Sequence, residues 1–150
     1  DALASEADFL SVGTNDLIQY TLAIARDDEG VTGLYQPLHP AMLRLLAMTT
    51  SAAKSCGIPV SICGEMAADP RYALVLLALG FNELSMTPGA IPLVKEVIRR
   101  STHEDAVELL EHIQGMNHAG EIADYVDSMM IDRFSDIVRP SIRSAPRSAR

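Results

Sequence analysis

Three polar residues near the N-terminus have side chains that suit an anionic, phosphate-bearing ligand. Asn15 and Asp16 follow a Gly-Thr pair, and Arg26 lies ten residues after Asp16. An aspartate is a hard oxygen ligand suited to Mg²⁺, and an asparagine can hold a phosphate oxygen or orient a substrate. An arginine can bind a carboxylate or a phosphate through two hydrogen bonds. Plainer roles stay open, because Asn15 or Asp16 would also suit a helix N-cap, and Arg26 could pair with Asp27 or Asp28 in solvent.

Cys63, in the stretch "SICGEMAADP", is the fourth candidate. Its thiol could act as a nucleophile, a metal ligand or a proton donor, or it could pack as a small buried hydrophobe. No second cysteine or histidine has metal-site spacing, and the four histidines lie away from the predicted strand ends. Glu65, if close enough, would disfavour the thiolate. A thiol that keeps its proton is better suited to donate it than to attack.

Short apolar runs that alternate with helical patterns predict how these residues are positioned. Strands are expected in "FLSVG" (9–13), "IPVSIC" (58–63) and "NELSM" (82–86). Helices are expected after "GTND", with Leu17, Tyr20 and Leu22 among the apolar positions, and over 39–57, 69–80 and 87–100, with two more over 104–113 and 119–134. Three strands alternating with helices indicate an α/β fold with a parallel sheet. Because the carboxyl ends of parallel strands meet at one edge, the turns 13–16, 63–65 and 85–87 should open on a shared site.

The predicted strands are too few for a closed barrel. A (β/α)8 barrel needs roughly 250 residues, whereas the chain has 150. The pattern therefore indicates either a small open sheet or the last part of a larger barrel.

Composition excludes several classes of function. The chain carries 20 acidic and 12 basic residues, a net charge of −8. Five of the arginines lie from Arg133 onward, which leaves residues 1–132 with a net charge of −12. An acidic body does not suit a nucleic-acid binder, and no apolar run approaches the ~18 residues of a membrane span. Two cysteines with no disulfide pattern indicate a reducing compartment, so we expect a cytoplasmic protein. The basic segment 133–150 is predicted to be a disordered tail.

Four segments closely resemble enzyme I of the phosphoenolpyruvate-dependent phosphotransferase system. They are "FLSVGTNDLIQYTLAIARD", "LYQPLHPAMLRLL", "GIPVSICGEMAADP" and "GFNELSMTPGAIPLVKEVIR", which lie between Phe9 and Arg99, and the resemblance covers roughly residues 8–100. The resemblance implies the last three βα units of a (β/α)8 TIM barrel plus C-terminal helices, an incomplete barrel as given. Residues 1–132 would be the C-terminal portion of the phosphoenolpyruvate-binding barrel domain. Pyruvate phosphate dikinase and phosphoenolpyruvate synthase share similar motifs, so a relative of these enzymes is an alternative.

The resemblance also implies roles for the candidate residues. Asn15 and Asp16 match a pair that contacts phosphoenolpyruvate, with Asp16 also on Mg²⁺. Arg26 matches an arginine that binds the substrate phosphate, and Cys63 matches the acid that protonates the enolate carbon. The family moves the phosphoryl group to a histidine in a separate domain, which has no match here, and then to a histidine-containing phosphocarrier protein, releasing pyruvate. The chain alone is therefore expected to be inactive.

A non-catalytic role of the same barrel is the second hypothesis. The family's barrel domain is also its dimerisation domain, which implies a homodimer. An incomplete barrel has open sheet edges, and such edges invite pairing with another chain. A dimerisation or assembly module is thus the alternative to a phosphotransferase-system enzyme, which could belong to the sugar-transport branch of the family or to its nitrogen-regulatory branch.

Overall fold

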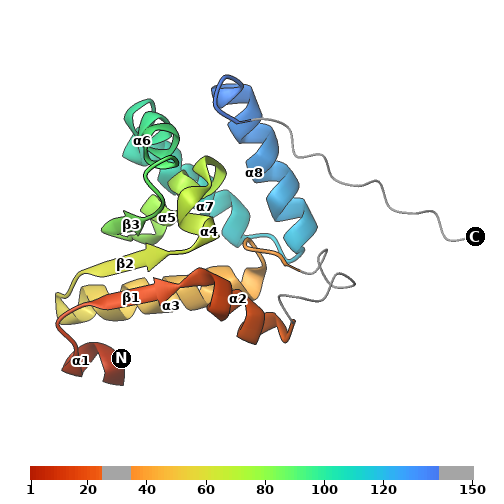
Figure 1. Cartoon of the computed structure of the whole chain (residues 1–150). Coiled ribbons are helices and arrows are strands. Elements are labelled where there is room, and N and C mark those ends of the chain that lie inside the picture. The colour runs from red at the N-terminus through yellow and green to blue at the C-terminus, as the bar shows by residue number, and fades with distance from the viewer. Residues whose placement is uncertain (25–34, 139–150) are drawn as a thin grey trace, which may run out of the picture.

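The computed structural model describes residues 1–24 and 35–138 (Figure 1). Its strands are β1 (Leu10–Gly13), β2 (Val60–Cys63) and β3 (Glu83–Ser85). Its helices are α1 (Ala2–Glu6), α2 (Thr14–Leu22), α3 (Pro40–Cys56), α4 (Glu65–Ala68), the 3-10 helix η2 (Pro70–Tyr72), α5 (Ala73–Leu79), α6 (Ile91–Arg99), α7 (His103–Gln114) and α8 (Ala119–Phe134).

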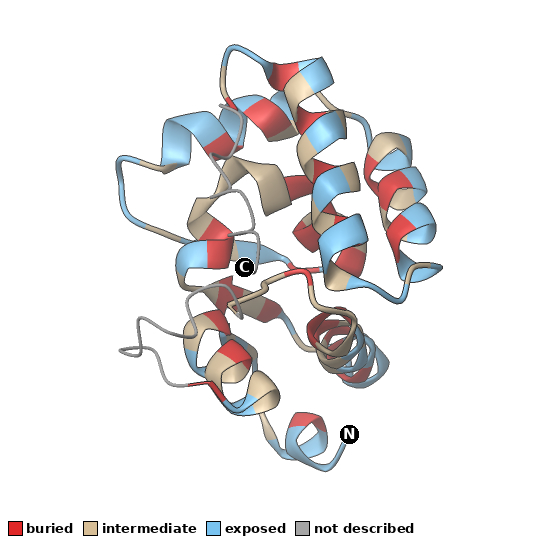
Figure 2. Ribbon diagram, turned by 90° about the vertical axis from the view of Figure 1, so that its right-hand side faces the viewer, coloured by how far each residue is buried: buried red, intermediate tan, exposed pale blue. Residues whose placement is uncertain are grey.

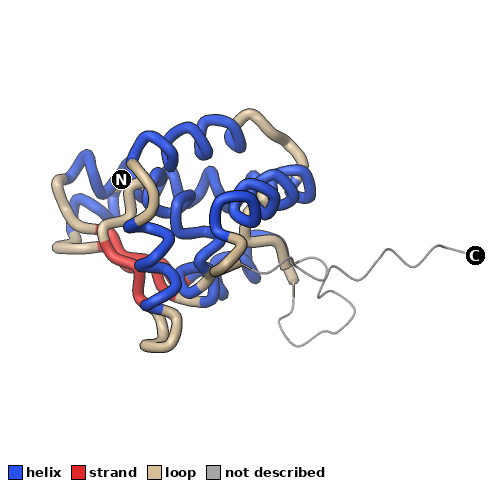
Figure 3. Tube along the Cα trace, turned by 90° about the horizontal axis from the view of Figure 1, so that it is seen from above, coloured by secondary structure: helices blue, strands red, loops and turns tan. Residues whose placement is uncertain are grey.

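The three strands form one parallel sheet in the order β1-β2-β3. The α/β fold with three parallel strands and helical connections that the sequence predicts is therefore confirmed. Seen from above, the strands lie together toward one side of the molecule, and helices occupy most of the remainder (Figure 3). The register pairs Gly13 with Cys63 and Cys63 with Ser85, so the three carboxyl ends are level. The polar turns that follow the strands must therefore share one edge of the sheet.

Only one face of the sheet carries the core. Val60 and Ile62 of β2 are buried, and they alternate with the half-buried Ser61 and Cys63. Figure 2 shows the same division in the helices, whose buried stripes face inward and whose exposed residues face outward. Strands that are covered on both faces read as continuous apolar runs, whereas alternation marks a sheet with one polar face. The face opposite the core is therefore polar, and it is the face that Cys63 shares.

Helix α3 forms as its sequence predicts. His39 is its N-cap, where Nδ1 accepts a hydrogen bond from the backbone N–H of Ala41 at 3.1 Å. Pro40 occupies the first position, where its missing N–H has no cost. The helix ends at Gly57, which adopts a left-handed conformation with φ of 68°.

The next predicted helix, over 69–80, is divided in two. Asp69 is an N-cap, because its side chain accepts a hydrogen bond from the backbone N–H of Arg71. That cap starts η2, however, and α5 begins only at Ala73. The Asp-Pro pair thus starts a tight 3-10 turn that leads into the buried helix. No helix in the described ranges is long and apolar enough to span a membrane.

The C-terminal helices are joined by an ion pair. Arg133 of α8 donates to both carboxylate oxygens of Asp105 in α7, at 2.8 and 2.9 Å. Asp105 also closes a capping box with Thr102 at the start of α7. Phe134 and Val138 are buried in the main core. Helix α8 therefore extends past the predicted boundary between 132 and 133. The arginines of this segment give it the composition of a tail, but Phe134 and Val138 pack into the core and hold its first residues there. The remainder of the predicted tail, 139–150, lies outside the described residues.

The Asp105–Arg133 pair predicts a pH dependence of stability. The Arg133 guanidinium, helped by the Thr102 backbone N–H, holds the pKa of Asp105 well below its usual value. Because the pKa of this carboxyl is lower in the folded state than in the unfolded state, its charge stabilises the folded state at pH values above the unfolded-state pKa of about 4. This stabilisation is lost progressively as the pH falls below about 4. We expect Asp105→Asn to lower the free energy of unfolding at pH 7, by an amount that shrinks as the pH is lowered from about 4. Denaturant unfolding at several pH values measures this difference.

A carboxylate outside the pair provides the control. Asp132 is exposed on α8. We expect Asp132→Asn to leave the free energy of unfolding nearly unchanged. A deficit of Asp105→Asn that stayed constant from pH 7 to pH 2 would contradict the assigned role of the ion pair.

Candidate functional site

The level strand ends bring three turns together beside β2 (Figure 1). The first turn enters α2 at Thr14, the second enters α4 at Glu65, and the third follows Ser85. Because β2 is the middle strand, the Cys63–Glu65 turn lies between the other two. The shared edge predicted from the sequence is present.

Thr14 joins the first turn to the second. Its side chain is fully buried, and its hydroxyl donates a 2.9 Å hydrogen bond to the backbone carbonyl of Cys63. A buried polar group is costly unless it is paired, and this pairing satisfies the hydroxyl. The hydrogen bond therefore fixes where the carboxyl end of β2 lies relative to the start of α2.

Asn15 completes the connection and has a fixed orientation. Its Oδ1 accepts hydrogen bonds from the hydroxyl of Tyr35 at 3.0 Å and from the backbone N–H of Glu65 at 3.3 Å. A backbone N–H can only donate, so the amide atom facing it must be the oxygen. The Nδ2 group has no hydrogen-bond acceptor among the described residues. Within residues 1–24 and 35–138, both N–H donors of the Asn15 amide are thus available to an oxygen from outside this part of the chain.

Gly64 permits the close approach of the two turns. Its φ of 106° and ψ of −170° belong to a region that only glycine adopts without strain. A Cβ at this position would lie 2.5 Å from Thr14 Oγ1 and 3.2 Å from Asn15 Oδ1. The glycine is therefore required both by the backbone conformation and by the hydrogen bonds that cross it.

The structure brings Asp16 and Cys63 to the same edge. Gly13 is the N-cap of α2, so neither Asn15 nor Asp16 has the capping role left open by the sequence. Asp16 lies in the first turn of α2, and its side chain is exposed. Cys63 is a free, half-buried cysteine next to the buried Ile62, so its side chain lies on the polar face of the sheet. Arg26 lies outside the described residues.

The fit of a divalent cation rests on Asp16. No group of three metal-ligating side chains is found in residues 1–24 and 35–138. Mg²⁺ is commonly held by one or two carboxylates, with water and substrate phosphates as the remaining ligands. The exposed Asp16 carboxylate at the strand edge fits this partial coordination.

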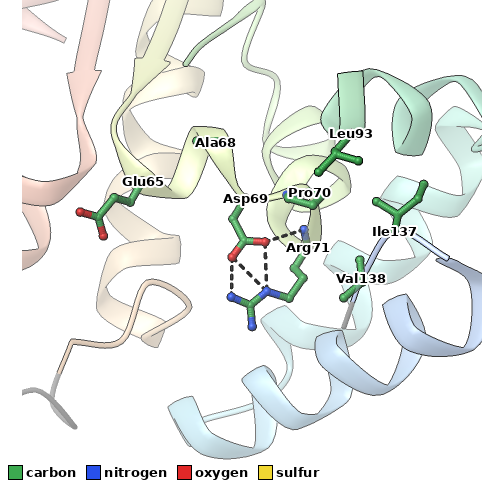
Figure 4. Close-up of a pocket in the computed structure, with 8 residues that line it drawn as sticks. All are labelled: Glu65, Ala68, Asp69, Pro70, Arg71, Leu93, Ile137 and Val138. Carbon is green, nitrogen blue, oxygen red and sulfur yellow. Dashed lines mark hydrogen bonds and ion pairs between the residues drawn. The ribbon is translucent and has the colours of Figure 1, made fainter. Parts of the chain in front are cut away.

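A pocket of about 560 Å³ lies beside the second turn (Figure 4). Arg71, in its wall, donates from Nε to both carboxylate oxygens of Asp69 at 3.0 and 2.9 Å and reaches Asp127 of α8 at 3.5 Å. These acidic partners, Asp69 foremost, raise the pKa of Arg71. Arg71 therefore holds α8 against η2. The pocket lining includes Glu65 but not Asn15, Asp16 or Cys63.

Residues 1–103 match the model of the family described as "PEP-utilising enzyme, PEP-binding domain". The chain belongs to this family. A phosphoenolpyruvate-protein phosphotransferase of Cupriavidus necator is 49% identical over 71% of this chain and 18% of the relative. The enzyme of the same name from Haemophilus influenzae is 38% identical over 87% of the chain and 23% of the relative. A Salmonella typhimurium protein named "Phosphoenolpyruvate-dependent phosphotransferase system" is 41% identical over 85% of the chain and 17% of the relative.

These matches confirm the resemblance to enzyme I read from the sequence. The chain spans about a fifth of the length of these relatives. The match to the PEP-utilising family covers every βα unit described above, including Gly13–Asp16 and Cys63–Glu65.

Three residues of this PEP-binding domain were missed as site residues in the sequence analysis. Thr14 and Gly64 stand inside the quoted motifs, but their role depends on the contact between the two turns. A Gly directly after a strand end was the available signal for Gly64. Tyr35 is 20 residues from Asn15 in sequence and precedes α3, and no local pattern predicts that hydrogen bond.

Proposed function

We propose that the chain supplies part of the phosphoenolpyruvate site of a phosphoenolpyruvate–protein phosphotransferase. The observation that carries this proposal is the orientation of Asn15, whose carbonyl is held by Glu65 N–H and the Tyr35 hydroxyl. Its amide group therefore donates toward an anionic ligand. Asp16 and Cys63 lie at the same edge of the sheet. A donor, a carboxylate for a cation and a thiol are the groups that the reaction needs.

Each residue has a proposed role. The Asn15 amide orients the phosphate of phosphoenolpyruvate, and Asp16 would hold Mg²⁺. When bound, Mg²⁺ neutralises charge on the phosphoryl group, because phosphoryl transfer depends mainly on positioning and electrostatic stabilisation. Arg26 binds the phosphate. Cys63 gives its proton to the enolate carbon as the phosphorus–oxygen bond breaks, which yields pyruvate, and the thiolate regains a proton from solvent.

The names of the relatives give phosphoenolpyruvate as the phosphoryl donor and a protein as the acceptor. The further steps are proposed from the resemblance to enzyme I. The phosphoryl group would pass to a histidine elsewhere in the complete enzyme and then to a histidine-containing phosphocarrier protein, in a cytoplasmic system serving sugar transport. The barrel domain would form a homodimer. The 150 residues alone would bind phosphoenolpyruvate weakly and would not turn it over.

Titration calorimetry of the chain with phosphoenolpyruvate tests the proposed half-site. We expect binding that is strengthened by Mg²⁺, and we expect Asp16→Ala to abolish the effect of Mg²⁺ because it removes the cation ligand. Asp132→Ala is the matched control, since this exposed carboxylate lies on α8, outside the site. Equal binding heats with and without Mg²⁺ would count against the half-site. The same loss of the Mg²⁺ effect in Asp16→Ala and Asp132→Ala would also count against it.

Replacing Asn15 by Asp separates binding from folding. The carboxylate can still accept from Tyr35 and from Glu65 N–H, but it lacks both amide donors and adds a negative charge. We expect thermal stability to change little and affinity for phosphoenolpyruvate to fall by at least about tenfold, which corresponds to about 1.4 kcal/mol. Undiminished affinity would show that the amide does not face the ligand.

A purely structural role in assembly remains a second candidate. β1 and β3 each pair with only one other strand in the described part of the chain. Strand edges of this kind can pair with another chain. Light scattering that finds a dimer together with no phosphoenolpyruvate binding would favour this candidate, whereas a monomer that binds the ligand would exclude it.

A further inference from the structure

A groove of about 690 Å³ lies at the end of the sheet opposite the candidate site. Its lining includes Ile58, which precedes β2, and Asn82, which precedes β3. The candidate site follows the other ends of the same strands. The groove volume falls within the ~300–1,000 Å³ typical of small-molecule sites. A ligand in this groove would therefore occupy a place distinct from that of phosphoenolpyruvate.

Helices α3, α5 and α7 line the groove, together with the segments that precede β2 and β3. The lining residues of α3 and α7 recur every three or four positions, so each of these two helices presents one stripe to the groove. These stripes include Ala47, Ser51 and Lys54 of α3, and Val107, Leu110 and Gln114 of α7. Leu77 and Leu79 of α5 line the space between them. The groove lining thus combines apolar side chains with polar ones, which also include Thr50, Asn82 and His103.

The charge of the groove is opposite to that of the chain. Acidic residues outnumber basic ones by 20 to 12 in the chain, yet the lining contains Lys54 and no aspartate or glutamate. Helix α3 has no acidic residue at all. Lys54 forms no ion pair with any residue in 1–24 or 35–138. Its position in the last turn suits the α3 dipole, but its ammonium group still lacks a counter-charge.

Asn82 contributes a second donor. Its Oδ1 accepts a 2.9 Å hydrogen bond from the backbone N–H of Val60. Because that N–H can only donate, the oxygen position is fixed and Nδ2 carries the two remaining donors. Among the described residues no acceptor faces Nδ2. The groove therefore contains an unpaired ammonium and an unpaired amide, both of which suit an anion.

We propose that this groove binds a small organic anion with an apolar body, of the size of a medium-chain carboxylate. The acidic group pairs with Lys54 and accepts from the Asn82 amide. The apolar body lies against Leu77, Val107 and Leu110. This inference goes beyond the proposed phosphotransferase role and does not depend on it.

A pair of fluorescent dyes tests the proposal on the whole 150-residue chain. 8-Anilinonaphthalene-1-sulfonate and N-phenyl-1-naphthylamine share an apolar body, and only the first is an anion. We expect the sulfonate dye to bind saturably, with octanoate displacing it, and the neutral dye to bind at least about tenfold more weakly. Equal affinity for the two dyes, or no saturable binding of the sulfonate dye, would overturn the proposal.

Two substitutions locate the site. Lys54→Gln should lower the affinity of the chain for the sulfonate dye and for octanoate about tenfold. Lys95→Gln removes the same charge from an exposed position on α6 and should change these affinities less than twofold. Ser51→Trp, at an exposed position on the groove wall, should block binding without unfolding the chain. Asp16→Ala should have no effect, which separates this site from the phosphoenolpyruvate site. Equal losses for Lys54→Gln and Lys95→Gln, or binding unaffected by Ser51→Trp, would contradict the assignment.

Discussion

Replacing Gly64 by alanine should destabilise the chain and disrupt the candidate site in one step. A residue with a Cβ is strained at φ of 106° and ψ of −170°, at a cost of about 1–3 kcal/mol. The new Cβ would also lie 2.5 Å from Thr14 Oγ1, which holds Cys63 in place. We therefore expect a loss of at least about 2 kcal/mol in the free energy of unfolding, with weaker phosphoenolpyruvate binding in whatever fraction remains folded.

Gly120→Ala is the matched control for this substitution. Gly120 lies in α8, a Cβ there would meet nothing within 4 Å, and its φ is not positive. Alanine is preferred to glycine within a helix by up to about 1 kcal/mol, so this variant should be as stable as the parent or more stable. Chemical denaturation of both variants measures the difference. A Gly64→Ala variant that unfolds at the parent's denaturant concentration would show that the two turns do not depend on their close approach.

Cys63→Ala should have the largest effect on the proposed reaction. In a full-length enzyme that carries this segment, loss of the proton donor should lower pyruvate formation by on the order of 10²–10⁴-fold. Phosphoenolpyruvate binding should change little, because in the proposed reaction the thiol would contact the carbon that is protonated and not the phosphate. Cys63 is half-buried at the end of β2, and alanine fits the space that the thiol occupies.

Stereochemistry distinguishes a proton donor from a merely structural thiol. Phosphoenolpyruvate labelled at C3 with hydrogen isotopes gives a chiral methyl group in pyruvate when an enzyme group protonates one face. We expect the residual product of Cys63→Ala to have lost this chirality, since water would protonate both faces. Cys56→Ala, at the exposed end of α3, should keep the full rate and chirality. Retained chirality in Cys63→Ala would assign the proton to another group.

Local patterns in the sequence were enough to predict the elements and the edge at which they meet. Strand-and-turn patterns placed Gly13, Cys63 and Ser85 at strand ends, and the parallel register aligns them. The caps of α3 also follow local rules, because His39, Pro40 and Gly57 act through their immediate neighbours. Predictions of this kind succeed when the physical cause lies within a few residues of the feature.

Features that depend on distant contacts could not be predicted in the same way. Thr14 is 49 residues from the carbonyl that it binds, and Tyr35 must cross from the start of α3 to reach Asn15. The burial of Phe134 and Val138 depends on how α8 packs, so composition alone placed the tail boundary too early. The division of the predicted 69–80 helix likewise reflects Asp69, whose side chain caps the 3-10 turn and pairs with Arg71.

Chemical-shift mapping of the ¹⁵N-labelled chain tests the central claim most directly. Phosphoenolpyruvate with Mg²⁺ should shift the backbone amides of residues 13–16, 63–65 and 85–87, because these turns share one edge of the sheet. The amides around Lys54 and Asn82, at the opposite end, should not move. Shifts at all three turns, lost in Asn15→Asp, would establish the half-site. Saturating shifts that avoid these turns, or that persist in Asn15→Asp, would contradict it.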